Sequence, residues 1–195
     1  MSDAFGATPG GLYSQILNLA GVLSRKLGLK VPRYQRPYTW GEREVRQLIQ
    51  DLWLAFERKA TFYFIGQIVL VKNNGKYEIS DGQQRLATLT MLIAYVRDRL
   101  PGRVKAYQTL MLDEQGRPRL ELREDDASFY RGYVQEPGKM AESGVLPEIG
   151  VDSKDALANA ARTIADELGD IADRDLDAFL SYVARACTLN VVDAE

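Results

Sequence analysis

The sequence predicts an α+β protein in which antiparallel hairpins are surrounded by helices. Three observations support this class: helical apolar spacing recurs along the chain, aromatic and β-branched residues fill positions 61–71, and turn residues separate pairs of short strands. With 195 residues, 46% of them apolar, the chain is long enough to bury a core without disulfides or metals.

The first third of the chain predicts two helices joined by an extended segment. Apolar residues at spacings of three and four predict a helix over residues 12–27, which Gly28 ends. Pro32 and Pro37 then favour extended backbone, because proline disfavours helix in the residue before it. A capping box at residues 39–42 predicts the start of the second helix.

A hairpin and a long helix follow. Residues 61–71 predict a strand in which Gly66 marks a close backbone approach or a bulge. Asn74-Gly75 predicts the hairpin turn and residues 77–79 the return strand. Helical spacing begins at Asp81-Gly82 and continues to Pro101.

The remaining segments alternate between strand and helix. They are predicted as strands over 105–112 and 118–122 around Gly116, a helix over 126–133, a loop over 137–150, helices around 157–168 and 176–183, and a strand over 188–192. We expect a core over residues 1–125 and, over 126–195, a partial helical extension of the same domain.

Composition excludes several classes of function. With no histidine, the chain cannot build Ser-His-Asp or Cys-His pairs, a His-ligated zinc site or a histidine-dependent nuclease. Cys187 is the single cysteine, which fits a reducing compartment. The N-terminus does not look like a signal peptide, and the longest nearly apolar stretch, residues 62–71, is too short to span a bilayer. We therefore expect a soluble cytoplasmic protein without membrane partners.

The charges are segregated along the chain. Residues 1–112 hold 16 Lys and Arg against 8 Asp and Glu, whereas residues 113–195 hold 9 against 19. Residues 25–46 alone contain seven cations and two carboxylates. Such a segment suits a polyanionic partner, although a solvated basic rim explains the charges equally well.

The junction between the return strand and the long helix has the parts of a phosphate-binding site. A helix that begins near Gly82 directs free backbone amides outward, and glycine lets an anion approach closely. Arg85 can add a fork of donors, and Gln83 and Gln84 can hydrogen-bond phosphate, ribose or an attacking water. Asp81 can hold a phosphate-bound Mg²⁺ directly or through water.

A simpler explanation of the same residues is structural. Asp81 and Gln84 have capping-box spacing, Gly82 can serve the turn alone, and Arg85 can be an ordinary surface cation. The two adjacent glutamines and the basic segment upstream count against this alternative.

The extended segment 31–40 interleaves cationic, amide and aromatic side chains: Arg33, Tyr34, Gln35, Arg36, Tyr38 and Trp40. Aromatic rings stack on bases, and arginines pair with phosphates. Tyr38 and Trp40 are more simply core anchors beside the following helix, which leaves Gln35 and Arg36 as the better site candidates.

Three motifs in this order resemble a known family. Val31-Pro-Arg-Tyr-Gln-Arg-Pro-Tyr-Thr-Trp40, Phe64-Ile-Gly-Gln-Ile68 and Ser80-Asp-Gly-Gln-Gln-Arg-Leu-Ala-Thr-Leu89 resemble the DGQQR domain, the N-terminal part of GmrSD-type and SspE-type modification-dependent restriction proteins. The resemblance covers roughly residues 15–100 and implies a ParB/sulfiredoxin-like fold, in which a Gly-x-x-Arg box at a helix start binds nucleotide phosphates.

The resemblance implies an NTP-binding and NTP-hydrolysing sensor that couples nucleotide state to the detection of modified phage DNA, with Mg²⁺ and GTP or ATP. By position in the motifs it assigns catalysis to Gln83, Gln84 and Arg85, and nucleotide binding to Gln35, Arg36, Asp81, Gly82, Gln83, Gln84 and Arg85. It assigns DNA sensing to Arg33, Tyr34 and Gln35, while the metal is expected at Asp81, directly or through water, from the chemistry of its carboxylate.

The sequence departs from the family pattern at two places. Ala87 stands where threonine is common, but Thr88 is retained, so we expect little effect. Family members usually continue into a Phe-Glu-x-x-Asn-x-x-Gly-like motif and an HNH-type nuclease, whereas this chain ends at Glu195. We expect a truncated N-terminal portion or a stand-alone sensor, without nuclease activity of its own, whose cleavage partner is a missing domain or another chain.

Two rival functions stay open at this point. One is a DNA-binding module that needs no nucleotide and uses residues 25–46, with stacking by Tyr34. The other is a structural interaction domain in which Asp81 and Gln84 only cap a helix.

Overall fold

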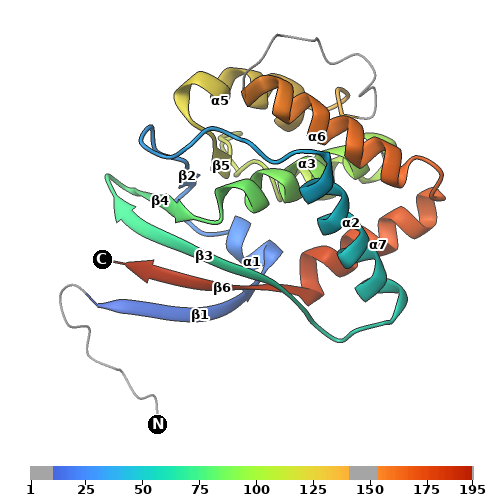
Figure 1. Cartoon of the computed structure of the whole chain (residues 1–195), viewed down its shortest axis with the longest axis horizontal. Helices are drawn as coiled ribbons and strands as arrows, with labels where there is room; N and C mark the ends of the chain where they lie inside the picture. The colour runs from blue at the N-terminus through green and yellow to red at the C-terminus, as the bar shows by residue number, and fades with distance from the viewer. Residues whose placement is uncertain (1–10, 141–152, 195) are drawn as a thin grey trace.

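The computed structural model describes residues 11–140 and 153–194, which form a six-stranded mixed sheet packed against helices (Figure 1). The strands are β1 (Leu12–Asn18), β2 (Leu29–Lys30), β3 (Tyr63–Asn73), β4 (Lys76–Asp81), β5 (Leu120–Glu121) and β6 (Cys187–Ala194), in the order β1-β6-β3-β4-β2-β5. The predicted α+β class is confirmed. The ParB/sulfiredoxin-like core and the division at residue 125 stay predictions.

Seven α-helices lie within the described residues, together with a 3₁₀ turn at Pro101–Arg103 and a π turn at Arg131–Gln135. The helices are α1 (Leu19–Leu23), α2 (Glu42–Glu57), α3 (Gln83–Arg99), α4 (Val104–Gln108), α5 (Glu124–Tyr130), α6 (Ser153–Leu168) and α7 (Asp173–Ala186). In this described part of the chain, no helix has the length and apolar character needed to cross a membrane.

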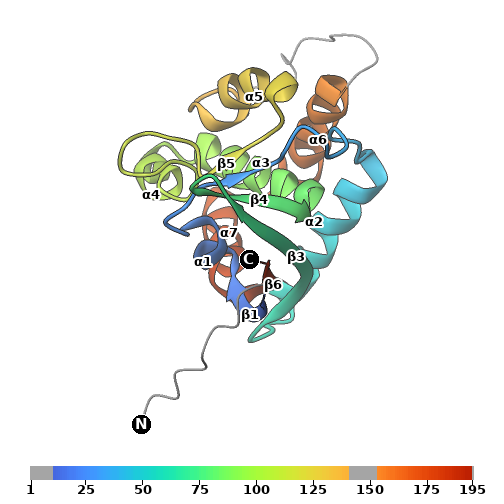
Figure 2. The same cartoon turned by 90° about the vertical axis from the view of Figure 1, so that its left-hand side faces the viewer.

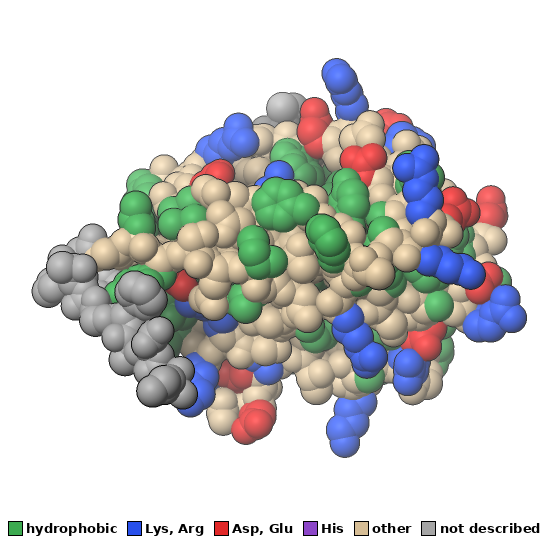
Figure 3. Space-filling model, turned by 90° about the horizontal axis from the view of Figure 1, so that it is seen from below, with side chains coloured by type: hydrophobic (Ala, Val, Ile, Leu, Met, Phe, Trp, Pro, Cys, Tyr) green, Lys and Arg blue, Asp and Glu red, His purple; other side chains and the backbone are tan. Residues whose placement is uncertain are grey.

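The last strand lies inside the sheet. β6 pairs antiparallel with β1 and parallel with β3, so the C-terminal residues share a sheet with residues from the start of the chain. Cys187, Leu189 and Val191 of β6 are buried, whereas Thr188 and Asn190 between them are partly exposed. One face of the sheet therefore contacts the core. Leu12, Ile16 and Phe64 are exposed apolar residues. Seen from below, the surface mixes apolar, basic and acidic side chains (Figure 3).

Helix α3 runs through the centre of the molecule, surrounded by other helices (Figure 2). Its fully buried Arg97 donates hydrogen bonds to the backbone oxygens of Val134, Gln135 and Glu136, at 3.1, 2.9 and 2.9 Å. Near the other end, the Tyr130 hydroxyl donates to the Ala87 carbonyl at 2.8 Å. These contacts join α3 to the π turn near its end and to α5 near its start.

The helix predicted over residues 12–27 is wrong. Residues 12–18 form β1, an edge strand in which Leu12 and Ile16 are 74% and 61% exposed, and only α1 is helical. A spacing of four keeps residues on one face of a strand as well as of a helix, so the spacing alone could not separate the two structures.

The first predicted hairpin is confirmed, and the second is reduced to a single antiparallel bridge between Leu112 and Pro118. Asn74 and Gly75 have φ of 46° and 75° in the turn between β3 and β4. Around Gly116 the turn exists, but residues 104–108 form α4, and β5 pairs in parallel with β2 rather than with a neighbouring hairpin strand. The Gln108 side chain is held by Arg97 and by the Gln135 carbonyl, which favours the helix there.

The remaining helices are close to their predicted places, with one correction to a cap. The N-cap of α2 is Gly41 rather than Thr39, and its backbone N–H donates to Glu44 at 3.0 Å. The predicted final helices and strand correspond to α6, α7 and β6. Most of the loop predicted over residues 137–150 lies outside the described residues.

Candidate functional site

One cavity of about 180 Å³ gathers every residue predicted to bind nucleotide, together with Trp40. Its lining is Gln35, Arg36, Trp40, Asp81, Gly82, Gln83, Gln84 and Arg85. The first three come from the segment between β2 and α2, and the others from the junction of β4 and α3. Two segments that are more than forty residues apart in the sequence therefore meet at the start of α3.

Gly82 shapes the floor of this cavity. It has φ of 90°, and a Cβ at this position would lie 2.5 Å from Ile68 Cγ2 and 3.0 Å from the Gln67 carbonyl oxygen. The first hydrogen bond of α3 runs from Leu86 N to Gly82 O at 3.1 Å. The amides of residues 83–85 precede it and have no intrahelical acceptor, so they supply the positive end of the helix.

Asp81 does not cap α3. The N-cap is Gly82, without a side-chain cap, and the Asp81 side chain is exposed. The capping-box alternative therefore does not explain Asp81, whose carboxylate is left for solvent or a ligand.

Gln84 is buried and clamps the segment that forms the opposite wall. Its Oε1 accepts hydrogen bonds from the backbone N–H of Thr39 and Trp40, at 2.8 and 3.3 Å, and its Nε2 donates to the Pro37 carbonyl at 2.9 Å. Both carbonyl lone pairs of this amide are thus used by backbone groups. Gln84 acts as a positioning residue in this geometry.

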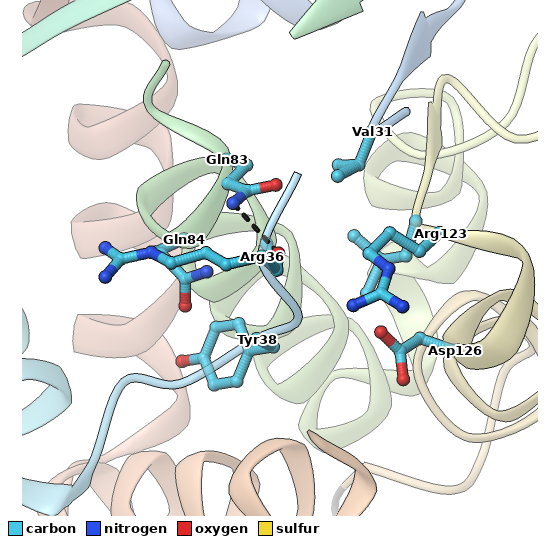
Figure 4. A pocket seen from close by; sticks show the side chains of 9 residues that line it. Val31, Arg36, Tyr38, Gln83, Gln84, Arg123 and Asp126 are labelled. Carbon is cyan, nitrogen blue, oxygen red and sulfur yellow. Dashed lines mark hydrogen bonds between the residues drawn. The ribbon is translucent and has the colours of Figure 1, made fainter. Parts of the chain in front are cut away.

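Gln83 is also buried and extends the clamp. Its Nε2 donates to the Arg36 carbonyl at 3.0 Å and more weakly to Gln35 Oε1 at 3.5 Å. Gln35 in turn donates to the Ser80 carbonyl at 2.8 Å. Figure 4 shows the Gln83–Arg36 hydrogen bond, with the Arg36 side chain pointing away from Arg123.

A second cavity, which Arg123 lines together with Gln83 and Gln84, is too small for a ligand. It has a volume of about 10 Å³ between Gln83, Tyr38 and Asp126, and its surroundings are drawn in Figure 4. That volume suits about one water molecule. The cavity that contains Arg85 is therefore the better candidate for a ligand.

Arg85 is the cation best placed in the cavity. Its Nη1 donates to the Gln67 carbonyl at 3.4 Å, and within residues 11–140 and 153–194 it forms no ion pair with a carboxylate. Arg36 is exposed at the rim. The two guanidinium groups outnumber the single carboxylate of Asp81, so the cavity carries net positive charge.

Two of the three residues predicted to sense DNA lie outside the cavity. Arg33 pairs with Glu124 at 3.3 Å on the surface, and the Tyr34 hydroxyl donates to Glu78 at 3.3 Å from a side chain that is 73% exposed. Gln35 lines the cavity. The predicted DNA-sensing residues thus form a surface that adjoins the cavity through Gln35.

The basic segment 25–46 is partly neutralised. Arg25 forms an ion pair with Asp193 at 2.8 Å and lies 4.1 Å from the centre of the Tyr77 ring. Arg46 pairs with both Glu42 and Glu167. A simple count of cations therefore overestimates the charge that this segment can offer to nucleic acid.

The described residues hold no cluster of three or more Asp, Glu, Cys or His that could bind a metal by itself. Mg²⁺ that arrives on a polyphosphate needs only one or two carboxylates from the protein. The exposed oxygens of Asp81 at the edge of the cavity fit that requirement.

Sequence reasoning missed a second depression that adjoins this cavity. A groove of about 530 Å³ between α2 and β3 shares Trp40 and Arg85 with the cavity and continues to Gln47, Asp51 and Tyr63. The available signal was the spacing of Arg43, Gln47 and Asp51 at four-residue intervals on one face of α2. A core anchor was the simpler expectation for Trp40, and it does pack on the core, but it also lines both spaces.

The chain also matches a family model. Residues 17–188 match the model described as GmrSD restriction endonuclease, N-terminal domain. No curated protein matches the chain.

Proposed function

This chain belongs to the family of N-terminal domains of GmrSD restriction endonucleases, and we propose that its part in restriction is to bind and hydrolyse a nucleoside triphosphate. The family implies a role in a restriction system, with DNA and a nuclease domain as partners. In the proposed mechanism, the nucleotide state of this domain controls DNA recognition, and a nuclease domain or subunit elsewhere performs cleavage.

The single observation that carries the proposal is the composition of the cavity at the start of α3. Seven residues chosen from the sequence for nucleotide binding line one space, and two of them are arginines. Free amides at the end of a helix and guanidinium groups are the donors that phosphate oxygens accept from. The volume of about 180 Å³ suits a polyphosphate chain rather than a whole nucleotide.

The role proposed for each residue follows from the hydrogen-bond donors and acceptors that its side chain does not use within the protein. Arg85 would meet the negative charge that develops on the transferred phosphoryl group, with Arg36 closing from the rim. Gln83 would orient the attacking water, because both acceptor sites of Gln84 are occupied by the backbone of Thr39 and Trp40. Mg²⁺ bound to the phosphates would be held by Asp81, directly or through water, and would neutralise phosphate charge.

Coupling to DNA is supported by the clamp. Gln83 and Gln84 hold the backbone of residues 36–40, and the exposed side chains of Arg33 and Tyr34 lie just before this stretch. DNA bound at Arg33 and Tyr34 would shift the backbone of residues 36–40, which forms one wall of the nucleotide cavity. Nucleotide would likewise favour one position of that wall, since coupling between two sites is reciprocal.

Hydrolysis of Mg²⁺-NTP by the wild-type chain and by Arg85→Ala tests the proposal. We expect Arg85→Ala to lower turnover by about 100-fold or more, because one preorganised cationic donor is lost from the transition state. Arg174→Ala is the control, since its side chain is 90% exposed on α7. Equal turnover by wild type and Arg85→Ala would contradict the role of this cavity.

A further inference from the structure

The groove between α2 and β3 continues directly from the phosphate cavity. Trp40 and Arg85 line both spaces, so the two form one path over the surface. The groove has a volume of about 530 Å³, which together with the cavity falls within the range of small-ligand sites. From Glu44 to Asp51 the axis of α2 rises by about 10 Å, so the groove extends well away from the phosphates.

The charge changes along this path. The cavity has two arginines and one carboxylate, whereas the groove balances Arg43 and Arg85 against Glu44 and Asp51. A polyanion such as a nucleic-acid backbone would meet two carboxylates in the groove, which disfavours it. A polyphosphate joined to a neutral group suits these charges better, because the cavity is positively charged and the groove has no net charge.

The far end of the groove presents hydrogen-bond acceptors beside an aromatic ring. Gln47 Nε2 donates to Asp51 Oδ1 at 2.8 Å, which uses one lone-pair site of the carboxylate and leaves both of its oxygens able to accept from a ligand. Glu44 accepts on Oε2 from the backbone N–H of Gly41 at the start of α2, so Asp51 is the carboxylate farther along the helix from the phosphates. Asp51 and Tyr63 both line the groove. Burial, and then the Asp51 carboxylate, raise the pKa of Tyr63.

We propose that the α2–β3 groove holds the nucleoside of the bound triphosphate, with Asp51 reading the base and selecting guanine over adenine. This inference rests on the proposed function, because it places the rest of a nucleotide whose phosphates lie at residues 82–85. Guanine presents a ring N–H and the N2 amino group side by side, and a carboxylate accepts both. Adenine presents no such pair of adjacent donors. Tyr63, which is half-buried against the core and lines the groove, is the aromatic side chain on which the base would stack.

Calorimetric titration of the full 195-residue chain tests this placement. The ligands are Mg²⁺-GTP, Mg²⁺-ATP, Mg²⁺-XTP and inorganic tripolyphosphate. The variants are Asp51→Asn, Arg85→Ala and the control Glu57→Gln, which makes the same carboxylate-to-amide change on an exposed part of α2 outside the groove. Thermal melts of each variant check that it is folded.

We expect the wild type to bind GTP at least about tenfold more tightly than ATP. Asp51→Asn should weaken GTP by about tenfold or more and bind XTP better than the wild type does, because the new amide donates to the C2 carbonyl of xanthine. Its affinity for tripolyphosphate should not change, and Glu57→Gln should behave as the wild type.

The outcomes separate the two proposals. If Arg85→Ala weakens tripolyphosphate while Asp51→Asn binds GTP as tightly as the wild type, the nucleoside placement is overturned and the phosphate site stands. Equal wild-type affinities for GTP and ATP would also overturn the choice of guanine. If Arg85→Ala binds tripolyphosphate as the wild type does, the proposed function itself falls.

Discussion

Gly66 of β3 makes room for the guanidinium of Arg85. A Cβ added at Gly66, which has φ of 137°, would lie 3.0 Å from the Arg85 Cζ and Nη1 atoms. The register between β3 and β6 shifts between Phe64 and Gly66, so the strand bulges where it meets the arginine. The missing side chain in β3 thus sets where the principal cation of the cavity lies.

Gly66→Ala should therefore impair nucleotide hydrolysis as Arg85→Ala does. The new methyl group would push the flexible guanidinium away, and the positive φ would cost about 1 to 3 kcal/mol of stability. Hydrolysis rates and urea denaturation measure the two effects. The control is Gly75→Ala in the hairpin turn, which also has positive φ but has open space around its Cβ position. Full turnover in Gly66→Ala would refute the steric link.

Gln84→Ala should lower both stability and nucleotide affinity. The substitution removes the acceptor for two backbone amides and the donor to Pro37, which should cost about 1 to 3 kcal/mol in urea denaturation. It would also free the wall formed by residues 35–40, and so weaken nucleotide binding. The comparison is Gln50→Ala, whose side chain only reaches Glu167 at the surface. A stability loss with unchanged nucleotide affinity would favour the purely structural interaction domain.

Cys187 should make stability fall as the pH rises above 9. Burial raises the pKa of this thiol from 9.0 to about 12, so between pH 9 and 10 the unfolded chain releases the proton and the folded chain keeps it. The free energy of unfolding should drop by about 1 kcal/mol by pH 10. Burial also raises the pKa of Tyr38 and Tyr130 above the ordinary value of 10.0, so these tyrosines add to the decrease as the pH approaches 10. The decrease should therefore be smaller in Cys187→Ala than in the wild type by about 1 kcal/mol at pH 10; an equal decrease in the two proteins would contradict the assignment.

DNA binding without nucleotide should depend only moderately on salt. Of the seven cations in residues 25–46, Arg25, Arg33 and Arg46 pair with carboxylates, so four remain for phosphates. The slope of log affinity against log salt should be about −4 or shallower, as measured by fluorescence anisotropy with duplex DNA. A slope of about −6, unaffected by added nucleotide, would favour the nucleotide-independent DNA-binding module.

The residues that line the cavity could be grouped from the sequence because most of them are contiguous. Residues 81–85 are contiguous at a strand-to-helix junction, where glycine and free amides point to anion binding without knowledge of the rest of the fold. Gln35 and Arg36 could be predicted as site residues because they lie in an extended segment, set by two prolines, in which cationic, amide and aromatic side chains alternate. Gly66 was likewise recognised as a close approach, although its partner, Arg85, was not.

What the sequence could not supply depends on tertiary contacts. The clamp role of Gln84 needs the position of the backbone at residues 37–40, which no local pattern encodes. The groove needs Asp51 and Tyr63, which come from different elements and are brought together by the packing of α2 beside β3. The error at residues 12–18 has a similar cause, since this edge strand is defined by its pairing with β6.

The most direct test is a crystal structure of the chain with Mg²⁺ and a non-hydrolysable NTP analogue. We expect the phosphate oxygens within hydrogen-bonding distance of the backbone amides of residues 83–85 and of the Arg85 guanidinium. An analogue bound with its phosphates at another surface, with the amides of residues 83–85 covered by protein, would contradict the central claim that the start of α3 binds polyphosphate.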